Sequence, residues 1–125
     1  MVKLILKSLS SPDVEPGQWV PNDNRVFILL QLEVGAVGRV GCDVFDVVVA
    51  TPEGLTEGAP VDRLGAISRR ALIVLRRFAW DSLQAVIEEI LHDCEAGTWE
   101  ESVLRLLRYF AWEFEDYADE SKSVS

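Results

Sequence analysis

The chain has 125 residues, 49% of them hydrophobic and 9% aromatic, which is enough for one core, so we expect a single domain over residues 1–125. Its 12 Lys and Arg against 21 Asp and Glu give a net charge of −9, which repels nucleic acid and anionic membranes and favours a basic protein partner. Cys42 and Cys94 show no spacing typical of a disulfide framework. No apolar run approaches the roughly 20 residues that span a bilayer, and the N-terminal apolar stretch is too short for a signal peptide, so we expect a cytoplasmic location.

Residues 1–79 are predicted to form mainly strands. The first is Val2–Leu9, and a loop rich in Pro and Gly follows it. Residues 26–34 and 40–51 are rich in β-branched side chains and flank Gly35-Ala36-Val37-Gly38-Arg39, where glycines suit a hairpin loop. We therefore expect these two strands to pair antiparallel.

The second strand of this hairpin alternates in polarity. Phe45, Val47 and Val49 share one face, and Asp46 marks the other face as the wetter one. The following Thr51-Pro52-Glu53-Gly54 suits a type I turn. Residues 68–77 are short, apolar and bracketed by arginines, so they are predicted to form a further strand, although a short helix fits the periodicity almost as well.

Two helices are predicted over residues 80–110. Asp81 can cap the first, Gly97 ends it, and its apolar residues recur at helical spacing: Leu83, Val86, Ile87, Ile90, Leu91 and Cys94. Thr98 opens the second, and Glu101 three residues later completes a capping box. The predicted buried face of the second helix consists of Trp99, Val103, Leu106, Leu107 and Phe110.

Residues 111–118 either form a final strand or continue the second helix, and the extended form is favoured because it anchors the terminus to the sheet. Residues 119–125 are expected to be a flexible tail. Together these elements predict an α+β fold with a mostly antiparallel sheet of four to five strands and two C-terminal helices packed on one face.

Acidic residues concentrate in the C-terminal part of the chain, where aromatic side chains interleave with them. Aromatic groups supply contact area and carboxylates attract cationic surfaces, so this mixture favours binding of a basic protein. The predicted contact residues are Trp112, Glu113, Glu115, Asp116 and Tyr117, with a rival patch on the first helix at Glu88, Glu89 and Asp93. If the partner is a nuclease, these carboxylates could cover its basic substrate groove.

The residues do not favour catalysis. His92 is predicted on the exposed face of a helix without a nucleophile at helical spacing, and Cys94 points to a different side and is expected in the core. Asp43 and Asp46 alternate out of phase on a strand and cannot chelate one ion together. We therefore expect no catalytic residues, no metal site and no cofactor, and we predict that the chain is not an enzyme.

Several motifs, taken in order, resemble the Imm8 family of immunity proteins. These are Leu6-Lys7-Ser8 with Ser11-Pro12-Asp13, Trp19-x-Pro21, Gly41-x-Asp43-x-Phe45-x-Val47-x-Val49-x-Thr51-Pro52, Thr98-Trp99, and Trp112-Glu113-Phe114-Glu115-Asp116-Tyr117. The resemblance runs nearly the full length of the chain. It implies a small α+β protein that is encoded beside a polymorphic toxin and binds and neutralises the C-terminal domain of that toxin.

Two other functions remain open at this stage. A self-associating scaffold would use the second apolar face of residues 26–34, with Phe27 and Leu29, as a homodimer surface. A hydrolase that uses carboxylates alone would need two acidic groups brought together from separate parts of the chain.

Overall fold

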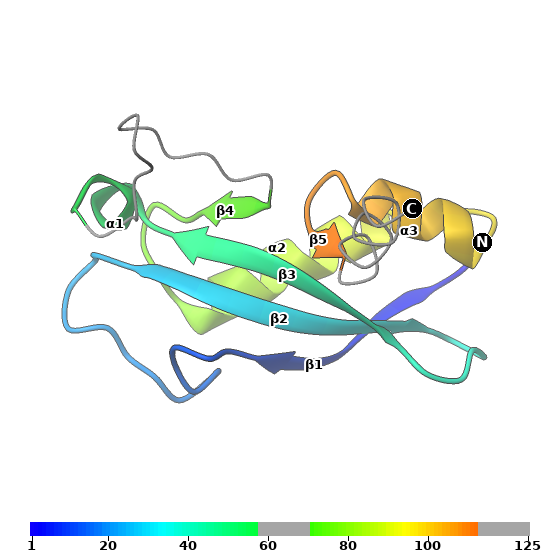
Figure 1. Cartoon of the computed structure of the whole chain (residues 1–125), viewed down its shortest axis with the longest axis horizontal. Coiled ribbons are helices and arrows are strands. Elements are labelled where there is room, and N and C mark those ends of the chain that lie inside the picture. The colour runs from blue at the N-terminus through cyan, green and yellow to red at the C-terminus, as the bar shows by residue number, and fades with distance from the viewer. Residues whose placement is uncertain (58–70, 113–125) are drawn as a thin grey trace, which may run out of the picture.

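The computed structural model describes residues 1–57 and 71–112, which form a twisted sheet with helices on one side (Figure 1). The strands are β1 (Leu4–Ser10), β2 (Phe27–Ala36), β3 (Asp43–Ala50), β4 (Leu72–Val74) and β5 (Ala111–Trp112). The helices are α1 (Pro52–Glu57), α2 (Trp80–Asp93) and α3 (Trp99–Leu106). The predicted α+β class, with a mostly antiparallel sheet and helices in the C-terminal half, is confirmed.

The sheet has the order β1-β2-β3-β4, so β1 is an edge strand. β2 and β3 pair antiparallel from Phe27 opposite Ala50 to Val34 opposite Asp43, which confirms the predicted hairpin. Two short strands pair with the edge of β3 that faces away from β2. β4 pairs in parallel with the end of β3, and β5 pairs antiparallel with Phe45 and Asp46. The predicted strand in residues 68–77 is thus a three-residue strand, and it supplies the sheet's parallel pair within the described residues.

The hairpin loop lies a few residues later than predicted. Gly35 and Ala36 end β2, and the glycines with positive φ are Gly38 at 81° and Gly41 at 87°. Gly35 lies under a lysine instead, since a Cβ there would come within 2.6 Å of the side-chain Cε of Lys7, which would have to shift. The lysine stem therefore crosses the outer face of the sheet over this glycine.

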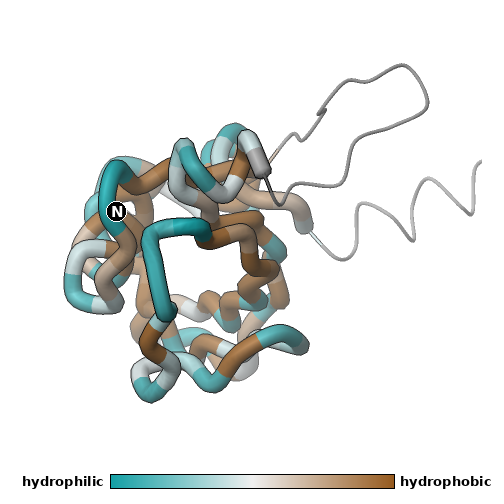
Figure 2. Tube along the Cα trace, turned by 90° about the vertical axis from the view of Figure 1, so that its left-hand side faces the viewer, coloured by the Kyte–Doolittle hydropathy of each residue, from teal (hydrophilic) through white to brown (hydrophobic). Residues whose placement is uncertain are grey.

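One hydrophobic core joins the inner face of the sheet to α2 and α3, and Figure 2 shows the hydrophobic segments gathered between these layers. The predicted inward face of β3 is confirmed, since Phe45, Val47 and Val49 are at most 1% exposed. The other principal members are Ile28, Leu30, Leu32, Val34, Leu83, Ile87, Leu91, Val103, Leu106 and Phe110. The outer face of β3 is only partly exposed to solvent: Asp46 is half-buried, but Val48 and Ala50 on the same face are buried.

The predicted type I turn at Thr51-Pro52-Glu53-Gly54 is wrong, because these residues begin α1. The Thr51 Oγ1 accepts a hydrogen bond from the Gly54 amide at 3.1 Å, as an N-cap does, and Pro52 occupies the first helical position. A Cβ on Gly54 would lie 1.9 Å from the Val26 carbonyl oxygen. Only glycine therefore allows α1 to approach the start of β2 this closely.

The predicted cap of α2 by Asp81 is also wrong. The N-cap position is Ala79, which has no capping side chain, and Asp81 lies in the first turn, where a carboxylate favours the helix dipole. The helix instead starts at an aromatic cluster: Trp80 Nε1 donates to the Trp19 carbonyl at 2.7 Å, and Phe78 makes edge contacts with both tryptophans. At the other end α2 stops at Asp93, before the predicted Gly97.

α3 begins as predicted, with the Thr98 Oγ1 accepting from the Glu101 amide at 3.1 Å. Trp99 is half-buried and carries the Arg39 guanidinium 4.0 Å from its ring centroid, which ties the hairpin tip to α3. Ser102 is buried, accepts from the Ala96 amide and donates to the Thr98 carbonyl, so it holds the connection between α2 and α3.

Candidate binding surface

The solvent-facing side of α2 carries the largest group of carboxylates that the structure places on one element. Buried residues recur at Leu83, Ile87 and Leu91, so the opposite side of the helix faces solvent. We call its carboxylates the α2 acid face, and they are Asp81, Glu88, Glu89 and Asp93, all exposed. The chain contains no Lys or Arg between Phe78 and Leu104, so α2 itself supplies no cation to this face.

Two of these carboxylates stand where they destabilise the helix. Glu89 and Asp93 are four residues apart and repel each other, at a cost of about 0.2–0.5 kcal/mol for such a pair on a helix surface. Asp93 is also the last residue of α2, where a negative charge opposes the helix dipole. These two charges therefore do not stabilise α2.

Glu95, close by, has a structural role. Its Oε2 accepts the Leu4 amide of the edge strand at 2.8 Å, and its Oε1 lies 3.4 Å from Nδ1 of His92. Its side chain is only 12% exposed, whereas that of His92 is 81% exposed, as the helical spacing predicts. Glu95 therefore anchors β1 to the end of α2 and is not part of the α2 acid face.

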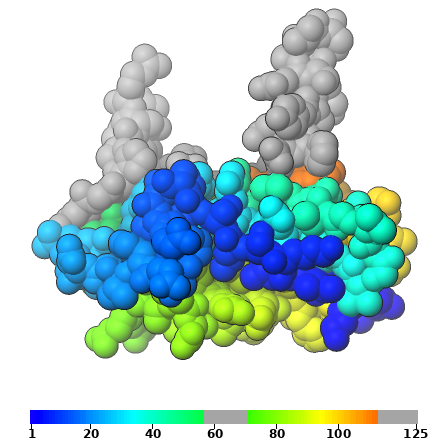
Figure 3. Space-filling model, turned by 90° about the horizontal axis from the view of Figure 1, so that it is seen from below, coloured from blue at the N-terminus to red at the C-terminus, as the bar shows by residue number. Residues whose placement is uncertain are grey.

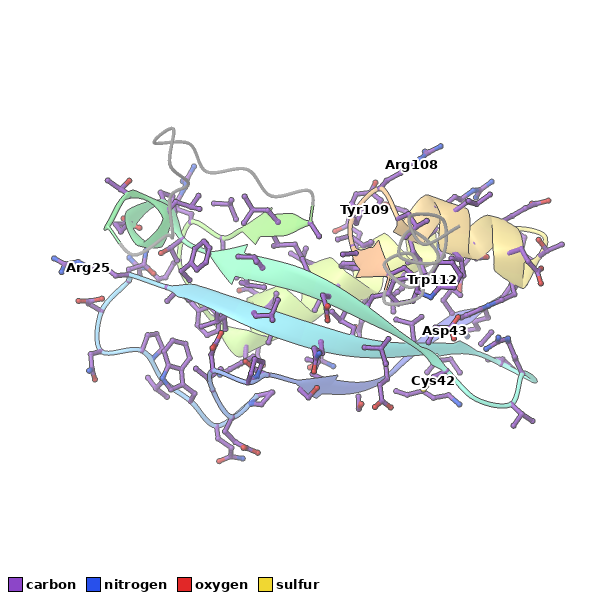
Figure 4. All side chains as sticks on the ribbon, viewed as in Figure 1. Arg25, Cys42, Asp43, Arg108, Tyr109 and Trp112 are labelled. Atoms are coloured by element: carbon purple, nitrogen blue, oxygen red, sulfur yellow. The ribbon has the colours of Figure 1, made fainter. Side chains whose placement is uncertain are left out.

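Trp112 lies against the core. It belongs to β5 opposite Phe45, and the two rings stack with centroids 6.4 Å apart and an interplanar angle of 19°. The side chain is half-buried between β3 and α3, while Arg108 and Tyr109 point outward from the end of α3 (Figure 4). The other predicted contact residues of this segment lie outside the described residues: Glu113, Glu115, Asp116 and Tyr117. The structure thus separates Trp112 from Glu88, Glu89 and Asp93, which lie on another element.

The side chains offer little for catalysis. Partial burial raises the pKa of the Cys42 thiol, and its hydrogen bond to the Glu33 carboxylate raises that pKa further. Burial likewise raises the pKa of Cys94, which confirms its predicted place in the core. Both shifts disfavour the thiolate that a nucleophile requires. Across residues 1–57 and 71–112, no three His, Cys, Asp or Glu side chains are grouped so that they could hold a metal ion.

Two grooves run along the free edge of β1, and no sequence pattern predicted them. One, of about 320 Å³, lies between residues 3–6 and the side of α2 that carries Glu88 and His92. The other, of about 310 Å³, continues past Leu6 to Trp80 and Gln84. Figure 3 looks onto this edge, with β1 (dark blue) directly above α2 (yellow-green). We call these two grooves together the furrow. The furrow forms because α2 crosses under the edge strand, and the sequence pattern of either element does not predict that crossing.

The outer face of the sheet carries Phe27 and Leu29, the two residues predicted to form the homodimer surface of a self-associating scaffold. Phe27 and Leu29 are half-buried and lie opposite Ala50 and Val48 of β3. Self-association through this face stays a prediction. No helix in the portion of the chain that the structure describes has the length and apolar character needed to cross a membrane.

The fold and this acidic surface are those of a small α+β binding protein. The family model of Imm8, immunity protein 8, matches residues 4–117, so the chain belongs to the Imm8 family. It is therefore an immunity protein of the polymorphic toxin systems, and this membership implies a non-enzymatic inhibitor whose partner is a cognate toxin. No significant match was found among curated proteins or among solved structures.

Proposed function

We propose that this immunity protein binds the C-terminal toxin domain of its cognate polymorphic toxin and neutralises it by placing carboxylates over a basic active site, such as the substrate groove of a nuclease. The observation that carries the proposal is the α2 acid face, where exposed carboxylates gather without a cation on their own helix. A nuclease groove is lined with Lys and Arg that hold phosphates. Carboxylates in the same places can pair with those groups and exclude the substrate.

Electrostatics also favours rapid capture. The net charge of −9 attracts a cationic domain over a distance of about one Debye length, roughly 8 Å at physiological ionic strength. Complementary charge raises association rates well above those of neutral pairs. Such speed suits an inhibitor that must act before the toxin reaches its substrate.

Two acidic sets are candidates for the contact, and each has three carboxylates. One is Glu88, Glu89 and Asp93 of α2; the other is Glu113, Glu115 and Asp116, with Tyr117 as an aromatic contact. We favour the α2 set because its three carboxylates lie within the described residues and are exposed to solvent. Trp112 then packs against Phe45 in the core rather than serving as the anchor.

Charge reversal of each set to Lys, with stopped-flow measurement of association with the toxin domain encoded beside the chain, tests the proposal. The matched control reverses three exposed glutamates elsewhere, Glu15, Glu33 and Glu53, and so makes the same change in net charge. We expect reversal of a contacting set to slow association by about tenfold or more and to weaken its salt dependence, while the control changes it far less. If all three variants slow association equally, net charge alone acts and the acid-face mechanism fails.

A further inference from the structure

The free edge of β1 has open backbone groups beside the two grooves that border it. The Leu4 amide points away from the sheet, because it donates to Glu95, and pairing alternates along the strand. Leu6 therefore also presents its N–H and C=O on the free edge. After the bulge between Leu6 and Ser8, the register of Ser8 with Glu33 and Ser10 with Gln31 turns Leu9 outward in the same way.

Within residues 1–57 and 71–112, hydrogen bonds close the start of this edge. At its start, the Val2 amide donates to the Ala96 carbonyl at 2.7 Å and the Leu4 amide to Glu95. Beyond the end of β1, Ser11 and Asp13 bond the carbonyl and amide of Leu29 in β2, so these bonds lie on the paired side and do not close the free edge. Along this edge, no group in residues 1–57 or 71–112 bonds the amides of Leu6 and Leu9 across the free edge. An edge left open in this way is a template for another strand.

The walls of the furrow specify the chemistry of that strand. The α2 wall carries Glu88 and His92, with Glu95 beyond them and no Lys or Arg on the helix. The outer side of β1 presents Ile5, which is 38% exposed, while the stem of Lys7 is turned over Gly35. An added strand would alternate its side chains between these two environments.

We propose that the toxin domain adds an extended segment to β1, pairing with the open groups of Leu6 and Leu9 and pointing basic side chains at Glu88 and His92 and apolar ones at Ile5. This inference rests on the proposed function and names the surface through which it operates. Main-chain bonds supply affinity in such a pairing, and the alternating side chains supply specificity. The α2 acid face then continues the contact beyond the added strand.

Amide hydrogen exchange of the full chain, measured residue by residue by NMR with and without the toxin domain, tests the pairing. We expect exchange of the Leu6 and Leu9 amides to slow by at least about tenfold in the complex, because each gains a hydrogen bond. The amide of Val40, a residue 98% exposed at the hairpin tip, serves as the control and should stay fast. Unchanged exchange at Leu6 and Leu9 in a complex that forms overturns strand addition and leaves the inhibitor function standing. Failure of any complex to form overturns both.

A backbone change tests the same bond without altering a side chain. A synthetic segment of residues 1–41 can be ligated at Cys42, which allows N-methylation of Leu6 or, as the matched control, of Val40. We expect the Leu6 variant to bind the toxin domain at least about tenfold more weakly, since the N-methyl group removes one hydrogen bond and occupies the space beside the edge. Equal affinity of the two N-methyl variants overturns the proposal, and circular dichroism shows that both are folded. Protected amides together with unaffected binding by the α2 reversal variant would retain the main-chain pairing, but would reject both the acid-face mechanism and the basic side chains assigned to Glu88.

Discussion

Thr51 joins three segments through one buried hydroxyl, and replacing it with Val removes that hydroxyl at nearly constant volume. Its Oγ1 accepts the amides of Val26 at 3.0 Å and of Gly54 at 3.1 Å, and it donates to the Asn24 carbonyl. The side chain is 0% exposed, so water does not replace the lost partners. Two N–H groups and one carbonyl lose a bond in the Thr51→Val variant.

The expected magnitude follows from those groups. A buried donor left without an acceptor costs about 1–3 kcal/mol, and partial relaxation offsets some of the sum for two donors, so we expect Thr51→Val to lower the free energy of unfolding by about 2–4 kcal/mol. Thr51→Ser keeps the hydroxyl and loses one methyl group, which costs about 0.8 kcal/mol. The difference between the two variants isolates the hydrogen bonds.

Urea unfolding followed by tryptophan fluorescence measures both free energies, with the m-value as a check that the two states are unchanged. If Thr51→Val is no less stable than Thr51→Ser, the hydroxyl does not hold these segments together, and our account of why α1 forms is refuted.

Three further predictions concern folding and reactivity. Gly54→Ala should lower the melting temperature more than any exposed substitution, since its Cβ would lie 1.9 Å from the Val26 carbonyl; calorimetry that finds less than about 1 kcal/mol of destabilisation contradicts this. Ile87→Ala should cost about 2–5 kcal/mol in urea unfolding, because Ile87 is 0% exposed, and a smaller loss would show that α2 shifts to fill the cavity. Glu33→Gln should speed iodoacetamide alkylation of Cys42 near pH 8, because removing the carboxylate lowers the raised pKa of that thiol and increases its thiolate fraction; an unchanged rate would show that burial alone controls it.

The parts of the fold that the sequence predicted are those that a local pattern determines. Alternation in β3 predicted that Phe45, Val47 and Val49 face the core, and helical spacing predicted the buried face of α2. The Thr98 cap and the hairpin also follow from short-range chemistry. In each case the residues that decide the structure are neighbours in sequence.

The errors occur where distant residues decide. Thr51-Pro52-Glu53-Gly54 suits both a turn and the first turn of a helix, and the contact between Gly54 and Val26 selects the helix. The start of α2 depends on Trp19, which lies far from Trp80 in sequence. The acid patch on α2 could be read from the spacing of Glu88, Glu89 and Asp93, whereas the furrow beside β1 depends on how α2 crosses the sheet and has no sequence signature.

The bond between the Leu4 amide and the Glu95 carboxylate spans 91 positions of the chain. During synthesis, β1 leaves the ribosome long before Glu95 is made, so the Leu4 amide waits through most of translation for its partner. Loop closure over such a distance carries a large entropic cost and slows folding. The last third of the polypeptide therefore completes the first strand, and a ribosome that stalls before residue 95 would release a chain whose leading edge is still free to pair with its neighbours.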